Sequence, residues 1–167
     1  MQYFWYYQTP ESFDNIIIIS DGSHLTGLTF DNKNSIRSTP SEFLPIFQET
    51  CQWLDTYFSG KSPNFIPKYK TGNITPFRKE VQDLLLKIPF GKTTTYGDLA
   101  KEIARAHHIK KMSARAVGGA VGWNPICIII PCHRVLGTNN RITGYGCGIK
   151  NKIALLELEK ITSKNHR

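Results

Sequence analysis

The chain has 167 residues, of which 40% are hydrophobic and 11% aromatic, so it can build the core of one domain or of two small ones. No stretch approaches the roughly 18 consecutive apolar residues of a membrane helix, and the first residues lack the basic segment of a signal peptide. We therefore expect a globular protein of the cytoplasm.

The net charge of +8 is unevenly distributed along the chain. Residues 1–67 contain three Lys and Arg against seven Asp and Glu, whereas residues 68–167 contain 18 against six, so the two parts carry −4 and +12. A basic part of this size favours a polyanionic partner such as DNA through the release of counterions. A solvated basic surface without a partner is the alternative.

The first 30 residues have the pattern of a small sheet. Three segments rich in β-forming residues are predicted as strands: 3–7, 15–20 and 24–30. Asp21-Gly22, between the last two, is a strong hairpin signal. We expect His24 to be a surface or turn residue rather than a metal ligand.

One amphipathic helix is predicted over residues 41–58 to cover this sheet. Pro45 lies near its start, where a missing N–H costs little, and Gly60 follows its end. The apolar stripe consists of Phe43, Phe47, Cys51, Leu54 and Phe58. This spacing predicts that Cys51 belongs to the core.

Residues 60–72 are predicted to be a linker, because they hold two prolines and little periodicity and coincide with the change in charge sign. We therefore expect two domains, 1–67 and 68–167. The first has an α/β pattern and the second a mostly helical one.

Three helices are predicted in the second domain. Residues 75–88 form one apolar face that ends at Pro89. Thr95, followed three residues later by an acid, resembles a capping box for a second helix, and Ser113 is a good N-cap for a third over residues 114–122. A basic connector joins these last two helices, which indicates a helix-turn-helix.

The third helix carries small residues where bulky ones would be usual: Ala114, Ala116, Gly118, Gly119 and Ala120. Taken alone, this face favours close packing in the core over close approach of a nucleic-acid backbone. Arg115 lies in the first turn, where a recognition helix usually meets DNA. It would otherwise be an ordinary solvated charge.

The run Ile128-Ile129-Ile130-Pro131-Cys132-His133 predicts a strand over residues 126–131 that delivers a cysteine beside a histidine. A neighbouring imidazole is a common way to activate a thiol, so Cys132 is a candidate nucleophile; a buried structural cysteine is the alternative. A metal cluster of Cys127, Cys132, His133 and Cys147 is disfavoured, because five positions along a strand place Cys127 and Cys132 on opposite faces. We expect no metal site and no disulfide between these two cysteines.

The motifs together resemble a known family. They are Ile130-Pro131-Cys132-His133-Arg134-Val135, Thr95-Tyr96-Gly97-Asp98-Leu99-Ala100, Arg115-Ala116-Val117-Gly118, Asn124-Pro125 and Gly144-Tyr145. Their combination is similar to the O6-alkylguanine-DNA alkyltransferases, densely from about residue 75 to residue 160. The resemblance implies a small N-terminal ribonuclease-H-like α/β domain and a C-terminal DNA-binding and alkyl-transfer domain.

The resemblance also implies an activity. The protein would bind double-stranded DNA from the minor groove as a monomer and without a cofactor, and would rotate a damaged guanine out of the stack. Cys132 would then accept the alkyl group irreversibly, once per protein, from O6-alkylguanine and by extension from O4-alkylthymine.

Roles carry over to individual positions. His133 would activate Cys132 through a water, and Glu159 would orient His133, although helical periodicity alone does not choose between Glu159 and Glu157. The remaining residues, given with their implied roles, are Asn124 for the turn near the cysteine, Arg115 for the hole left by the flipped base, and Tyr96, Arg134 and Tyr145 for substrate and DNA contacts.

Two positions depart from the family pattern. Cys147 precedes Gly148 where many members have Gly-Gly, and Trp123 replaces a residue that is often Arg. Three other functions compete with the repair reaction: a lesion-flagging protein, a DNA-binding regulator and a thiol hydrolase. The first would lack Cys132, the second would normally carry a further domain, and the third would turn over many times.

Overall fold

The structure, a computed structural model, describes residues 1–32 and 42–161. The chain forms two compact units, one comprising residues 1–73 and 125–129 and the other residues 74–124 and 130–167. The first holds a small sheet with a helix, and the second is mostly helical, as predicted. No helix of the described residues is both long enough and apolar enough to cross a lipid bilayer.

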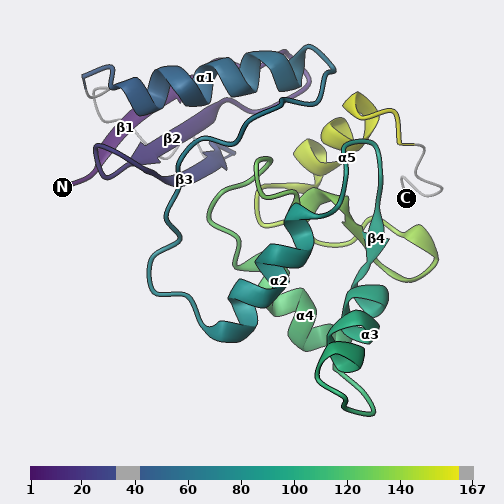
Figure 1. Ribbon diagram of the computed structural model, residues 1–167. Coiled ribbons are helices and arrows are strands. Elements are labelled where there is room, and N and C mark those ends of the chain that lie inside the picture. Colours follow the sequence, from purple (N-terminus) through teal and green to yellow (C-terminus); the bar gives the residue numbers. More distant parts are fainter. Residues whose placement is uncertain (33–41, 162–167) are drawn as a thin grey trace. The chain divides into compact units, whose positions relative to one another are not determined.

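The three predicted strands are confirmed in the first unit. They form an antiparallel sheet in chain order, with β1 at Tyr3–Tyr7, β2 at Ile16–Ser20 and β3 at Leu25–Phe30 (Figure 1). Helix α1 packs on the sheet. Ile16, Ile17 and Ile18 of the central strand β2 are all buried, so both of its faces are covered, which agrees with its unbroken run of four isoleucines.

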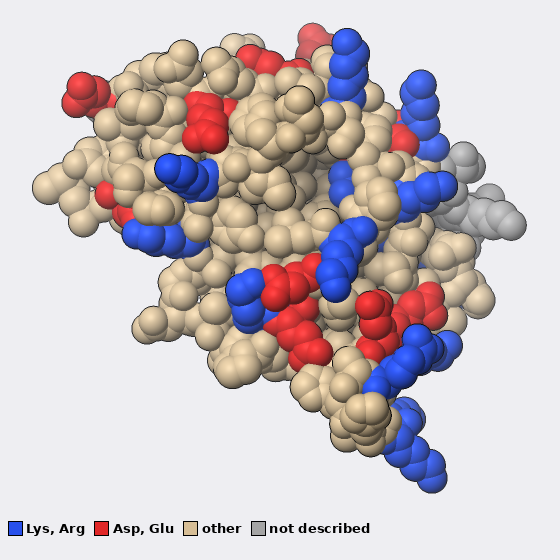
Figure 2. All heavy atoms as spheres, in the orientation of Figure 1, with Lys and Arg blue, Asp and Glu red and all other residues tan. Residues whose placement is uncertain are grey.

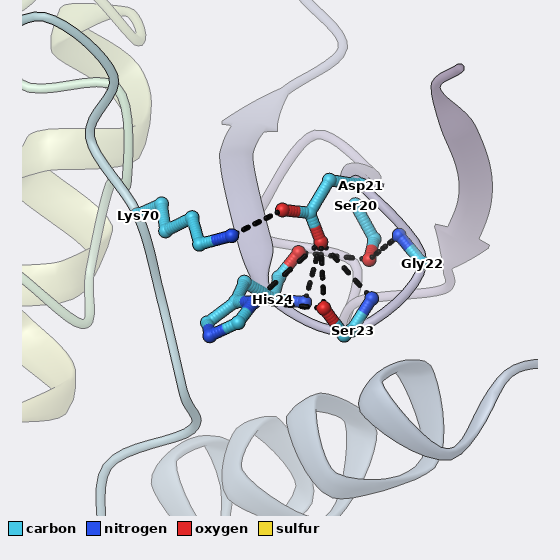
Figure 3. A network of polar contacts seen from close by, with 6 residues as sticks. All are labelled: Ser20, Asp21, Gly22, Ser23, His24 and Lys70. Atoms are coloured by element: carbon cyan, nitrogen blue, oxygen red, sulfur yellow. Dashed lines mark hydrogen bonds and ion pairs between the residues drawn. The ribbon is translucent and has the colours of Figure 1, made fainter.

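The turn between β2 and β3 is organised by one carboxylate. Asp21 Oδ1 accepts hydrogen bonds from the backbone N–H groups of Ser23 and His24, at 3.0 and 2.8 Å, and Oδ2 accepts one from Lys70 Nζ at 3.0 Å (Figure 3). Such an Asp-centred turn reverses the chain without help from the sheet. His24 is therefore a turn residue, as expected, and the strand begins one residue later than predicted.

Helix α1 spans Pro45–Phe58 and is shorter than the predicted 41–58. It begins at Pro45, whose fixed φ suits the first helical position, and residue 41 lies outside the described residues. The predicted stripe is partly wrong, because Phe43 is exposed before the helix and Cys51 is only half-buried. The buried side chains are Ile46, Phe47, Thr50, Trp53, Leu54 and Tyr57.

The second unit contains the other helices: α2 at Pro76–Leu86, α3 at Tyr96–Ala106, α4 at Ala114–Gly122 and α5 at Ile149–Leu158. The first three begin as predicted. The hydroxyls of Thr75, Thr95 and Ser113 each accept a hydrogen bond from the backbone N–H three residues later. Helices α3 and α4 pack together as the two helices of the predicted helix-turn-helix (Figure 1).

Short elements connect these helices to the cysteine. A parallel pair joins β4, Thr94–Thr95, to β5, Val135–Leu136. The 3₁₀ helix η1, Cys132–Arg134, immediately precedes β5, and a second one, η2, covers Thr138–Asn140. The start of α3 and the segment after the cysteine are thereby tied side by side.

The predicted strand over residues 126–131 is wrong. Only Ile126 forms a bridge to β3, at Leu28, after which Ile128 takes a φ of +70° and the Ile129 N–H turns back to the Cys127 carbonyl at 2.8 Å. These residues are buried on all sides. The apolar run therefore reflected burial rather than an extended conformation, an ambiguity that short apolar runs cannot resolve.

Candidate active site

Cys132 is a free thiol at the first position of η1, with only 6% of its surface exposed. The Asn124 side-chain amide donates hydrogen bonds to the Ile130 carbonyl at 2.8 Å and to Cys132 Sγ at 3.1 Å. Asn124 lies just beyond the end of α4. Its side chain therefore fixes both the backbone before the cysteine and the sulfur itself.

The thiol is protonated in this environment. Burial raises the pKa of Cys132 above its usual value, and this effect outweighs the hydrogen bond from Asn124, the positive charge of Lys152 and the influence of Tyr145, all of which lower it. A neutral thiol is a weak nucleophile. A nearby base must take its proton before the sulfur can react.

The next side chain on η1 supplies such a base. A 3₁₀ helix has three residues per turn, so consecutive side chains point about 120° apart. His133 is fully buried and its Nε2 lies 2.7 Å from Glu159 Oε1. Because an ionised carboxylate can only accept a hydrogen bond, the imidazole proton lies on Nε2. Nδ1 is therefore the basic nitrogen of the neutral ring.

Glu159 is a carboxylate held by several donors. Arg134 Nε and Nη2 donate to it at 2.9 and 3.0 Å, and the Gly91 N–H donates to Oε2 at 3.0 Å. Burial alone would raise the pKa of Glu159, but the hydrogen bonds and charges of His133 and Arg134 outweigh it and lower the pKa to about 2. Glu159 therefore stays ionised and orients the imidazole without taking its proton.

The pKa of His133 is lowered. Burial is the largest cause, Arg134 and Lys152 lower it further, and the Glu159 carboxylate only partly offsets them. Its ordinary value is 6.5. The imidazole consequently remains neutral, and able to act as a base, below the pH at which a solvated histidine becomes charged.

This shift predicts the acid side of the pH profile. Reaction of Cys132 with free O6-benzylguanine should keep its rate as the pH falls through 6.5 and lose it only at more acid pH, because His133 stays neutral there. Rates measured between pH 5 and pH 8 test this. A half-maximal rate at pH 6.5 or above would show that His133 is not shielded in this way.

Arg134 differs from the expectation that it contacts substrate or DNA. Its guanidinium is buried, donates from Nη1 to the Ile88 carbonyl at 2.7 Å and lies 5.8 Å from the centre of the Phe90 ring. Arg134 holds Glu159, and through it the orientation of His133.

Tyr96 lines an open hollow and interacts electrostatically with Cys132. The hollow has a volume of about 680 Å³ and is lined by residues from α3, α4 and the loop after β5, including Tyr96, Arg115, Gly118, Asn139 and Thr143. Burial raises the pKa of Tyr96, a hydrogen bond with Thr143 lowers it, and the charge of Cys132 raises it again. Its hydroxyl therefore keeps its proton.

Comparisons with known proteins agree with this geometry. The family model described as "6-O-methylguanine DNA methyltransferase, DNA binding domain" matches residues 76–161, and the model of the ribonuclease-like domain of the same family matches residues 3–66. The chain belongs to the 6-O-methylguanine DNA methyltransferase family. The resemblance stated from the motifs is therefore confirmed.

Individual relatives of this methyltransferase family match over most of their length. A methylated-DNA–protein-cysteine methyltransferase of Haemophilus influenzae is 39% identical over 95% of this chain and 87% of its own, and one of Methanosarcina mazei is 42% identical over 82% and 83%. Among solved structures, Mycobacterium tuberculosis OGT in complex with DNA superposes with a TM-score of 0.75 at 37% identity, over 93% of this chain and 92% of that one.

The small-residue face of α4 is open in this methyltransferase. Ala114, Ala116 and Gly119 are exposed, and a Cβ added at Gly119 would meet nothing within 4 Å. Core packing, which the sequence alone favoured, is therefore wrong for most of this face; Ala120 is buried. Arg115 is exposed beside these residues at the mouth of the hollow.

Trp123 stands at a position that is often arginine in the methyltransferase family. Its ring contacts a cation from another helix. The guanidinium carbon of Arg78, in the first turn of α2, lies 4.8 Å from the centre of the Trp123 ring. A cation–π contact of this kind holds the charge over the ring face. The end of α4 therefore has a positive charge in spite of the substitution.

Two groups that contribute to the site, a backbone N–H and a lysine side chain, were missed by reading the sequence. Gly91 is the turn residue, with a φ of +77°, whose N–H reaches Glu159. Lys152 lies seven residues before Glu159 on α5, hence on the same helical face, and is fully buried. That spacing was the available signal, but lysines are so rarely buried that Lys152 was not expected in the site.

Proposed function

We propose that this protein repairs O6-alkylguanine in DNA by transferring the alkyl group to Cys132 once and irreversibly. The observation that carries the proposal is a buried thiol held by Asn124 and followed in the chain by a buried imidazole that Glu159 orients. The family membership and the relatives' names support the same reaction.

The reaction steps follow from the neutral thiol of Cys132 and the neutral imidazole of His133. His133 removes the thiol proton through a bridging water, and the Cys132 thiolate attacks the alkyl carbon. A carbon–sulfur bond forms, the bond from that carbon to guanine O6 breaks, and the purine leaves with the electron pair. The protonated Tyr96 hydroxyl is suited to donate a hydrogen bond to this oxygen as charge develops on it. The same displacement applies to O4-alkylthymine, whose alkyl group is also attached to an exocyclic oxygen.

The product explains the single turnover. A thioether has no acidic proton and is a poor leaving group, so no group of the site can return Cys132 to a thiol. A thiol hydrolase would instead form a thioester, which water cleaves to release the thiol. Stoichiometric consumption of the protein is the expected kinetics.

The surface of the second unit fits a DNA partner. Four basic side chains lie on α3 and in the loop after it: Lys101, Arg105, Lys110 and Lys111. Figure 2 shows Lys and Arg side chains projecting over this part of the protein.

We infer that α3 and α4 enter the minor groove, with the open face of α4 allowing close approach of the DNA backbone. A damaged base must leave the stack to reach a sulfur that is only 6% exposed. We further propose that the protein acts as a monomer in the cytoplasm.

Intact-mass analysis tests the proposal directly. After incubation with a duplex oligonucleotide containing O6-methylguanine, the protein should gain one methyl group, on Cys132, with one guanine restored per protein. Cys132→Ser should gain none, whereas Cys51→Ser should behave like the wild type. Turnover beyond one equivalent, or methyl on another residue, would contradict the proposal.

A further inference from the structure

Arg78 presents a guanidinium whose N–H groups find no acceptor among the described residues. It lies in the first turn of α2, with its guanidinium carbon 4.8 Å from the centre of the Trp123 ring. No salt bridge or side-chain hydrogen bond of residues 1–32 and 42–161 involves this guanidinium. The face of the ring attracts the positive charge but leaves the N–H donors available to an anion.

The acids of α2 are paired with other residues. Asp83 forms an ion pair with Lys79 on the same helix. Glu80 lies 2.9 Å from the Nε2 of His107, which follows the end of α3. These contacts lie along the groove between α2 and α3, whereas Arg78 lies over the residue that ends α4. The charge of Arg78 is therefore directed to the end of α4.

Trp123 keeps this charge in a defined place at the surface. Both side chains are half-buried, so the guanidinium is neither enclosed by the protein nor free to sample solvent like an isolated surface arginine. A side chain that is ordered beforehand loses less entropy when it meets its ligand. The planar guanidinium also matches the oxygens of a phosphate group, to which it can donate two parallel hydrogen bonds.

The surface next to this pair is the open face of α4. Arg115, Gly119 and Gly122 follow one another at helical spacing and are exposed, and a Cβ added at either glycine would meet nothing within 4 Å. Trp123 follows Gly122 directly, and α2 packs on α4 (Figure 1). Arg115 is thus at the start of this face and the stacked arginine at its end, about 10 Å further along the helix axis.

We propose that Arg78, held over the ring of Trp123, binds a phosphate of the DNA backbone at the end of α4 that lies away from Arg115. The inference rests on the proposed function for its partner and adds a contact to it. About 10 Å of helix corresponds to roughly three nucleotides of one strand, so this phosphate is separate from the place where a base is extruded. Arg78 should therefore strengthen binding to damaged and undamaged DNA alike.

The first test measures binding of Arg78→Ala and Arg78→Gln to a duplex at several salt concentrations. Both variants should bind roughly five- to tenfold more weakly at about 0.1 M salt, with a salt dependence lower by about one unit. Reaction with free O6-benzylguanine should keep the wild-type rate. Lys79→Ala is the matched control, because it removes the same charge from the next residue of α2, which is exposed and paired with Asp83. It should bind almost like the wild type.

The second test locates the phosphate. In a series of duplexes, each phosphate around the lesion is replaced in turn by an uncharged methylphosphonate. At one position the replacement should weaken binding of the wild type but leave binding of Arg78→Ala unchanged, whereas other sensitive positions should affect both proteins equally. Trp123→Leu should weaken binding of the wild type and add nothing in the Arg78→Ala background, because the ring acts through the arginine.

Three outcomes would overturn the inference. Arg78→Ala and Arg78→Gln could match Lys79→Ala in affinity and salt dependence, which would make Arg78 an ordinary solvated charge. No methylphosphonate position could lose its effect in Arg78→Ala, which would exclude a defined phosphate contact. Slower reaction of both Arg78 variants with the free base would place their defect in the active site. Methyl transfer by the wild type is measured separately, so its absence would refute the proposed function and not be mistaken for one of these results.

Discussion

His133→Phe should slow alkyl transfer to Cys132 by about 10² to 10⁴, the range typical of a lost general base. The thiol is neutral because burial raises its pKa, so the variant loses the base that accepts its proton. Phenylalanine fills a similar space and leaves the buried pair of Arg134 and Glu159 intact. Binding to undamaged DNA should barely change. Single-turnover rates with an O6-methylguanine duplex, together with binding measured by anisotropy, test both expectations.

Glu159→Gln should slow transfer by a similar factor, because Gln can accept a bond from His133 without stabilising a charged imidazole. It also leaves the Arg134 guanidinium buried beside a neutral partner, a change that typically costs about 3–5 kcal/mol of stability. The thermal midpoint should therefore fall, and rates must be measured well below it. His133→Phe, which retains the ion pair, separates the catalytic loss from this loss of stability.

Glu157→Gln is the matched control on the same helix. Glu157 is exposed, whereas Glu159 is 3% exposed and bonded to His133. The variant should transfer methyl at the wild-type rate and unfold at the wild-type temperature. A slow Glu157 variant beside a normal Glu159 variant would show that the last helix has been assigned in the wrong register.

The elements of the fold that local chemistry specifies were predictable. Thr75, Thr95 and Ser113 each cap the helix expected of them, because a hydroxyl three residues before an unsatisfied N–H acts within one turn. The sheet of the first unit was predictable for the same reason, since strand patterning and the Asp21-Gly22 turn are local signals. The segment at residues 126–131 was not, because complete burial removes the alternation that distinguishes a strand.

The site was predictable only as far as its motifs extend. Cys132, His133 and Glu159 lie together as the family resemblance implied, and burial decides between Glu159 and Glu157. The intramolecular partners of Arg134 were not predicted, because the Ile88 carbonyl and the Glu159 carboxylate are 46 and 25 residues away in the chain. The exposure of the small-residue face of α4 was not predicted, for a related reason. Composition shows that side chains are small but not whether anything packs on them.

Arg115 separates base extrusion from simple electrostatic attraction. It is exposed in the first turn of α4 and lines the same hollow as Tyr96, whose pKa is raised in part by the charge of Cys132. If Arg115 were one phosphate contact among several, Arg115→Ala would weaken binding to all DNA alike and reduce the salt dependence by about one unit. Lys111→Ala, a change of an exposed lysine in the loop before α4, should show that behaviour and serves as the control.

If Arg115 instead fills the space vacated by the base, replacing it should destabilise the state in which the base is extruded. Extrusion costs a few kcal/mol, less for a weakly paired base and nothing for a free one, and each 1.4 kcal/mol corresponds to tenfold in rate. Arg115→Ala should therefore slow transfer from a fully paired duplex by about 10- to 100-fold, slow it less in single strands, and leave reaction with free O6-benzylguanine unchanged. Tyr96→Phe should also slow the free base, because the lost hydroxyl acts on the leaving oxygen. Rates on the three substrates decide the matter: an equal loss for Arg115→Ala on all of them would rule out this role.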